Sequence, residues 1–103
     1  MSKSVITIDP IHPGEILKEE FLEPHGLSAT AFAKRLGVPA NRITRIIAGN
    51  SSVTADTALL LSAAFDTSAE FWLNLQTGYD LETARRDETI LRKADSIEAI
   101  AAA

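Results

Sequence analysis

The 103-residue sequence contains no cysteine and no long run of apolar residues. A chain without cysteine has no disulfide framework, no thiolate zinc site and no cysteine nucleophile. No apolar stretch approaches the roughly 18 residues of a membrane-spanning helix, and the segment MSKSVITIDP lacks the apolar core of a secretory signal. These absences predict a soluble, cytoplasmic protein with no membrane partner.

Residue constellations typical of catalysis are also missing. The two histidines, His12 and His25, each lie in a Pro/Gly-rich helix boundary without a second ligand at metal-binding spacing, so we expect them to serve as caps or turn residues. The serines have no His–Asp partner set, and no glycine-rich phosphate loop is present. The glutamates of residues 15–23 follow helical spacing and are expected to form a solvated face. We therefore predict no enzyme, no metal, no cofactor and no small-molecule substrate.

What is present fits one all-α domain. Hydrophobic residues make up 46% and charged residues 23% of the chain, which is ordinary for a globular protein of this length. Turn and cap signals separate five segments with helical apolar spacing, followed by a charged, Ala-rich tail that keeps the same period through Ile90, Ala94, Ile97 and Ala101. The five predicted helices are EILKEEFLE (15–23), ATAFAKRL (29–36), PANRITRIIA (39–48), ADTALLLSAAF (55–65) and AEFWLNLQTGY (69–79).

The second and third of these helices carry the functional signal. Two short helices joined by a Gly-containing turn of about three residues form a helix-turn-helix, whose second helix lies in the DNA major groove. Here Ala33 is small where the helices should cross, Gly37 permits the sharp turn, Val38 can fill the angle between the helices, and Ile43 can pack into the core.

Charge along the chain agrees with that interpretation. The formal net charge is -4, which by itself argues against nucleic acid. Residues 24–55, however, contain four bases and no acid, while residues 1–23 and 56–103 carry -3 and -5. Phosphate contacts act over only about 10 Å at moderate salt, so a local basic face is sufficient.

Residues 27–65 resemble the helix-turn-helix domain of phage repressors and XRE-type regulators. A narrower resemblance, to HigA antitoxins, covers residues 12–84. It is carried by HPGEIL (12–17), Gly49, the stretch VTADTALLLSAAFDTSAEFWLNLQ (53–76) and Tyr79-Asp80-Leu81. The resemblance implies a five-helix, phage-repressor-like domain over 13–79, an N-terminal arm over 1–12 and a C-terminal helical extension over 80–103.

The resemblance also implies a function. HigA proteins are homodimeric antitoxins that neutralise HigB, an mRNA-cleaving toxin of the RelE type, and repress their own operon by binding double-stranded operator DNA. Ala29 and Ala40 depart from the polar residues common at these positions, so base reading is expected mainly from Asn41 and Arg45. The full set predicted to contact DNA is Ser28, Thr30, Lys34, Arg35, Pro39, Ala40, Asn41, Arg42, Thr44 and Arg45.

Three questions stay open from the sequence. Trp72, Leu75 and Tyr79 share one helical face, which is either core or the dimer interface. The toxin could be held by the arm 1–12, by the acidic first helix or by the tail 80–103. A plain helix-turn-helix repressor without a toxin, or an interaction module that no longer binds DNA, are the alternative functions.

Overall fold

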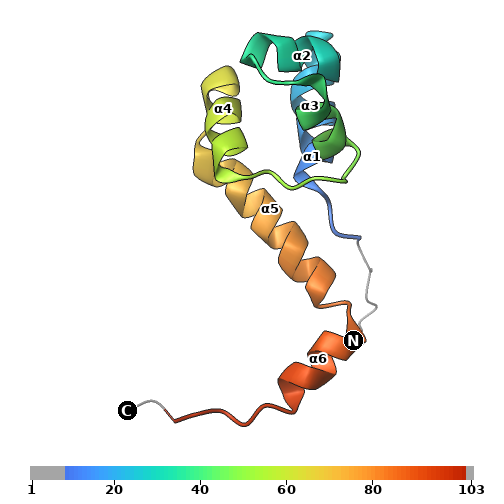
Figure 1. The fold of residues 1–103 in the computed structure, drawn as a ribbon, viewed down its shortest axis with the longest axis vertical. Coiled ribbons are helices and arrows are strands. Elements are labelled where there is room, and N and C mark those ends of the chain that lie inside the picture. Colours follow the sequence, from blue (N-terminus) through green and yellow to red (C-terminus); the bar gives the residue numbers. More distant parts are fainter. Residues whose placement is uncertain (1–8, 102–103) are drawn as a thin grey trace, which may run out of the picture.

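A computed structural model describes residues 9–101, which form helices joined by short turns, with no strand among them (Figure 1). The short run Val5–Ile8, expected as an arm or strand, lies outside the described residues. The elements are α1 (Pro13–Ile16), a π-helical turn η1 (Leu17–Leu22), a 3-10 turn η2 (Glu23–His25), α2 (Ala29–Leu36), α3 (Ala40–Ile47), α4 (Ala55–Phe65), α5 (Ala69–Ala84) and α6 (Glu88–Asp95).

Three predicted helices, those that became α2, α3 and α4, have the expected bounds to within a residue. The first predicted helix differs, because its continuous α-helix is replaced by α1, η1 and η2. Leu17 and Leu22 are five residues apart and both fully buried. In η1 the N–H of Glu23 reaches back to the carbonyl of Lys18, a wider i→i+5 turn that brings residues five apart toward the same face.

The last predicted helix, 69–79, is longer in the structure than the sequence indicated. α5 passes through the predicted domain boundary at 79/80 and ends at Ala84. Asp87 then caps a separate helix, with its carboxylate accepting from the N–H groups of Thr89 and Ile90 at 3.0 and 3.4 Å. α6 ends at Asp95, so the described part of the Ala-rich end is not helical, despite its high helix propensity. α6 lies apart from the other helices, beyond the end of α5 (Figure 1).

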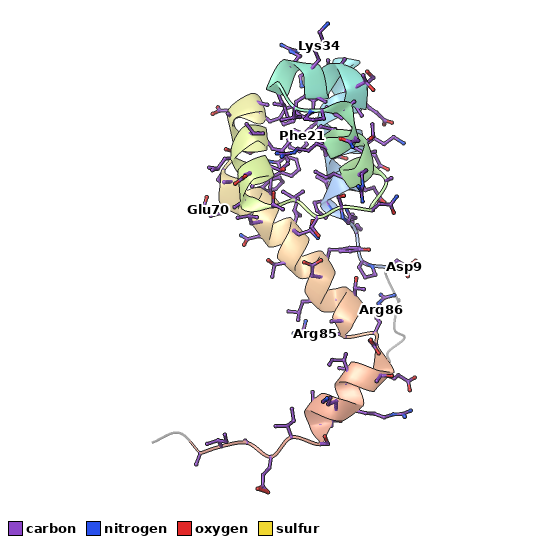
Figure 2. The ribbon with its side chains drawn as sticks, in the orientation of Figure 1. Asp9, Phe21, Lys34, Glu70, Arg85 and Arg86 are labelled. Carbon is purple, nitrogen blue, oxygen red and sulfur yellow. The ribbon has the colours of Figure 1, made fainter. Side chains whose placement is uncertain are left out.

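The core lies between α1–η1, the α2–α3 pair, α4 and the first half of α5. Trp72 is its largest member, with 0% of its surface exposed, and its indole N–H donates to Thr67 Oγ1 at 2.8 Å. Phe21 points from η1 into this core (Figure 2), where its ring lies 4.8 Å from that of Phe65 and 5.1 Å from that of Trp72. These aromatic contacts join the first and last helices of the domain around the α2–α3 pair.

Among the described residues, no helix has the length and apolar content needed to cross a membrane.

Candidate nucleic-acid interface

The turn between α2 and α3 is built from backbone groups. Gly37 adopts a left-handed conformation with φ of 74°, and the N–H of Val38 donates to the carbonyl of Ala33 at 3.0 Å. Ala33 is 1% exposed at the point where the helices meet. At the start of α2, Ser28 Oγ accepts from the N–H of Ala31 at 3.0 Å. The predicted helix-turn-helix is therefore formed, with each of its turn residues in the expected place.

The buried face of α3 packs against α1, which fixes the position of α3. Ile43 and Ile46 are buried with 0% and 2% exposure. A Cβ placed on Gly14 would overlap the carbonyl oxygen of Ile46, so the two backbones approach more closely than any side chain allows. The glycine of the HPGEIL block thus sets how deeply α3 sits in the domain, and therefore how far its outer face protrudes.

The ten residues predicted to contact DNA are all exposed. Four of them, Pro39, Asn41, Arg42 and Arg45, line one hollow of about 370 Å³, which α3 forms with the loop 48–54 and the start of α4. Ala40 and Thr44 lie on the exposed surface of the same helix, whereas Ser28 and Thr30 lie at the start of α2.

Four further polar residues line this hollow and were missed as interface residues; one of them, Thr57 of α4, is only 3% exposed. Ser51 and Ser52 belong to the loop 48–54 between α3 and α4, and Thr54 is the N-cap of α4. Ser51 and Ser52 bring hydroxyls to the hollow that Arg42 and Arg45 also line, and a hydroxyl there can donate to a phosphate oxygen. The hydroxyl of Thr54 instead donates to Thr57 Oγ1 at 3.4 Å. The signal in the sequence was the neutral, hydroxyl-rich run Asn50-Ser51-Ser52 directly after the predicted helix.

Lys34 and Arg35 lie elsewhere. Lys34 projects into solvent at the end of α2 (Figure 2). Arg35 lines a different cavity of about 640 Å³, together with His25, Leu60 and Phe65, between α2 and α4. The structure thus gathers Arg42 and Arg45 around the α3 hollow and places Arg35 apart from them.

The cations of α2 and α3 make no ion pair with any acid in residues 9–101. The described ion pairs use Lys18, Arg85, Arg86 and Arg92, all outside the acid-free segment 24–55. The positive charges of Arg42 and Arg45 are consequently available to an external anion such as a DNA phosphate.

The loop 48–54 is held against α5 by a buried amide. Gln76 is 5% exposed; its Oε1 accepts from the N–H of Val53 at 2.7 Å, and its Nε2 donates to Asp80 Oδ1 at 2.9 Å. The bond to Val53 joins the loop that carries Ser51 and Ser52 to α5, and the bond to Asp80 holds the Gln76 amide within that helix.

His12 also contacts this loop, through a hydrogen bond with the backbone of Ser51. Its Nδ1 accepts from the N–H of Gly14 at 2.9 Å, and its ring meets Tyr79 edge-on at 4.8 Å, which agrees with the predicted cap role. Burial lowers the pKa of His12 below its ordinary value, opposed by a hydrogen bond with the backbone of Ser51 and by the Asp80 carboxylate.

One predicted interface residue needs correction. Trp72 was left as either core or dimer interface, and its 0% exposure places it in the core of its own protomer, because a fully enclosed side chain offers no surface to a second copy. Leu75 and Tyr79 are half-buried, and their place in a dimer interface stays a prediction.

The Helix-turn-helix family model matches residues 18–72. The chain is 54% identical over 78 residues to Virulence-associated protein I of Dichelobacter nodosus, covering 76% of this chain and 72% of that protein. It is 43% identical over 76 residues to Antitoxin HigA-1 of Vibrio cholerae serotype O1, covering 74% of this chain and 71% of that protein.

Solved structures give the same picture. Antitoxin GraA in complex with its operator superimposes with a TM-score of 0.82 and 43% identity, covering 97% of this chain and all of that chain. Pseudomonas aeruginosa antitoxin HigA with higBA promoter also gives a TM-score of 0.82, with 41% identity, covering 89% of this chain and 99% of that chain.

Proposed function

The chain belongs to the HigA antitoxin family of helix-turn-helix DNA-binding regulators, and we propose that it represses its own operon by binding operator DNA as a homodimer and neutralises an mRNA-cleaving toxin of the HigB/RelE type. The observation that carries the proposal is the exposed face of α3, where Arg42 and Arg45 have no acidic partner among residues 9–101 and line one hollow with Ser51 and Ser52. That two of its structural neighbours bind an operator or a promoter supports the DNA partner.

The side chains divide between base reading and phosphate contact. Asn41 and Arg45 have the donor and acceptor geometry for bidentate recognition of adenine and guanine. Arg42, Thr44 and Lys34, with Ser51 and Ser52 from the loop, are suited to phosphate oxygens. Ser28 and Thr30 lie at the start of α2. Pro39 and Ala40 are exposed at the start of α3, and these small side chains let that end of the helix approach the base pairs. Arg35 lines the separate cavity between α2 and α4 and is expected to contribute least.

The proposed homodimer follows from the small size of the single DNA-contacting helix α3. A single eight-residue helix contacts few base pairs, whereas two copies related by a two-fold axis read half-sites about 34 Å apart. The acidic segments that flank the DNA-binding segment carry -3 and -5, and they leave surface complementary to a basic ribonuclease.

The DNA part is tested by fluorescence anisotropy with the promoter region upstream of the gene, at several salt concentrations. Arg45→Ala should abolish preference for the promoter over an unrelated duplex while circular dichroism stays unchanged. Lys18→Ala removes an exposed cation outside the segment 24–55 and should leave the affinity unchanged. Absence of salt-dependent binding of the unmodified protein to either duplex would favour an interaction module that has lost DNA binding.

The toxin part is tested separately by co-expression with the product of the adjacent gene. Co-purification and suppression of mRNA cleavage support an antitoxin. Promoter binding without any complex with that product would instead identify a plain repressor.

A further inference from the structure

The cavity between α2 and α4 has the size of a small-molecule site. Its volume is about 640 Å³, and it lies at the end of the molecule opposite α6 (Figure 1). Phe32, Arg35 and Leu36 follow helical spacing and line it from one face of α2. From α4, the short side chains of Ala63 and Ala64 leave the room that larger residues would fill. Sites that hold small organic ligands have volumes of roughly 300–1,000 Å³.

The interior of this cavity is apolar. The rings of Phe32 and Phe65 both line it, and they stack on each other with their centroids 5.0 Å apart and 24° between their planes. Phe32 is only 2% exposed, so the cavity reaches the edge of the core. Leu27, Leu36 and Leu60 are half-buried around the two rings. A flat apolar group can therefore pack here beside the stacked rings.

The polar groups of the cavity favour an anion. Arg35 and His25 line it, and none of the described residues in its wall is acidic. Arg35 has no ion-pair partner among residues 9–101. A guanidinium binds a carboxylate through two parallel hydrogen bonds, and the imidazole ring of His25 has an N–H that can donate a further one. An apolar cavity with an exposed arginine is thus complementary to an apolar molecule with one carboxylate.

We propose that the cavity between α2 and α4 binds a small molecule with a flat apolar body and one carboxylate, the body against Phe32 and Phe65 and the carboxylate on Arg35. The site goes beyond the proposed function, and it gives a role to Arg35, which lies apart from the α3 hollow. A protein partner would require about 20 to 30 contact residues, whereas nine described residues line this cavity.

Two probes that differ only in charge test the site. Phenylbutyrate has an aromatic ring and a carboxylate, and phenylbutyramide is its neutral amide. In an NMR titration of the isotope-labelled protein, phenylbutyrate should shift the backbone signals of the cavity residues in a saturable way. A dissociation constant of about 1 mM is expected for a ligand of this size, and phenylbutyramide should bind about fivefold more weakly. Equal affinity for the two probes, or shifts centred on another part of the chain, overturns the proposal.

The role of Arg35 is tested by two neighbouring substitutions. Arg35→Gln removes the charge and should weaken phenylbutyrate about fivefold while leaving phenylbutyramide unchanged. Lys34→Gln is the matched control, because Lys34 is an adjacent exposed cation that does not line the cavity. This variant should bind both probes as the unmodified protein does. Equal weakening of phenylbutyrate in the two variants would show general attraction to positive charge and contradict the assignment.

A third variant fills the cavity. Ala64 is exposed on α4, so Ala64→Trp should leave the fold intact while its indole occupies the space of the ligand body. Binding of both probes should be lost. Leu59→Trp places the same side chain on the same helix, at a position that is 61% exposed and outside the cavity, and should bind both probes normally. If folded Ala64→Trp binds phenylbutyrate with unchanged affinity, the proposed site is wrong.

Failure of this inference is distinguishable from failure of the proposed function. Promoter affinity and suppression of mRNA cleavage are measured without either probe, so they decide the function whatever the cavity binds. If the product of the adjacent gene shifts the signals of the cavity residues but phenylbutyrate does not, the cavity is a protein contact and the small-molecule site is excluded.

Discussion

α3 and α6 are helices of eight residues, each with an apolar face and a cation in its last turn, yet the structure uses them in opposite ways. In α3 the apolar face is buried and the cations Arg42 and Arg45 have no acidic partner in the described chain. In α6 the apolar face is exposed, and Arg92 pairs with Glu88 of the same helix at 3.2 Å.

The difference teaches which face of each helix is free to bind. Amphipathic spacing alone predicts a helix with an inner and an outer side, but not what lies on each side. α3 satisfies its apolar face within the chain and offers charge, which suits a polyanion. α6 satisfies much of its charge within the helix and offers apolar surface, which suits another protein surface.

The largest expected effect tests the apolar faces. Ile43→Ala should lower the free energy of unfolding by about 2 to 5 kcal/mol, because it opens a cavity under a residue with no exposed surface. Leu91→Ala should change the free energy of unfolding of the dilute protomer by less than about 0.5 kcal/mol, since its side chain is 42% exposed and lies outside the core. Urea denaturation of both variants at low protein concentration provides the measurement. A large loss for Leu91→Ala in dilute solution would mean that α6 packs within its own chain.

Much of this contrast could be predicted from the sequence, but only as far as local signals reach. The Ser28 cap, Gly37 and Pro39 gave the bounds of α2 and α3 nearly to the residue, because caps and turns depend on neighbours in the chain. The extent of α5 and the break before α6 were not predicted. No strong stop signal precedes Arg85, and the Asp87 cap is the kind of residue that also occurs on helix surfaces.

The polar residues of the candidate DNA interface could be predicted from the sequence, but the residues that hold α3 and the loop 48–54 in place could not. Asn41 and Arg45 follow from the helix-turn-helix pattern itself. The contributions of Gly14 and Gln76 depend on contacts with residues 32 and 23 positions away in the chain, and no periodicity reports contacts at such a separation. The π-helical turn η1 was missed for a similar reason, because packing against the core selects it over an α-helix.

A second prediction tests the charged face within the basic segment itself. Arg45→Ala should cost about 1 to 3 kcal/mol of promoter affinity per half-site, because Arg45 lines the α3 hollow and is suited to a bidentate base contact. Arg35→Ala should cost far less, because Arg35 lines the cavity between α2 and α4. Anisotropy titrations of the two variants under the same salt conditions measure both effects. Equal losses would show that total charge, rather than the geometry of α3, governs binding.

A third prediction concerns the loop beside α3. Gln76→Leu leaves the N–H of Val53 buried without an acceptor, so we expect a loss of about 1 kcal/mol or more in stability. Promoter affinity should fall as well, because the loop carrying Ser51 and Ser52 is no longer held. Gln76→Glu is the matched variant: its carboxylate still accepts from Val53 but repels Asp80, so it should regain stability as the pH is lowered. Thermal unfolding combined with anisotropy separates the two effects, and an unchanged affinity in a destabilised Gln76→Leu protein would exclude a positioning role.

The smallest expected effect is a pH dependence that arises from His12, beneath the same loop. Its pKa in the folded state is lowered by burial from the ordinary value of 6.5, so the unfolded chain takes up a proton before the folded chain does. The stabilisation from neutral His12 is therefore fully present above about pH 6.5 and is lost as the pH falls toward the folded-state pKa. Protonation also removes the Nδ1 acceptor that caps Gly14.

His12→Asn provides the control for this dependence, because asparagine is a good N-cap acceptor that does not titrate. The variant should lose the edge-on contact with Tyr79 and be less stable above pH 7, while its stability should fall less steeply between pH 6.5 and 5. Urea midpoints across this range give the two slopes. If the unmodified protein and His12→Asn lose stability with the same slope, the acid sensitivity belongs to other groups. His12 would then support the loop beside α3 in a way that does not depend on pH.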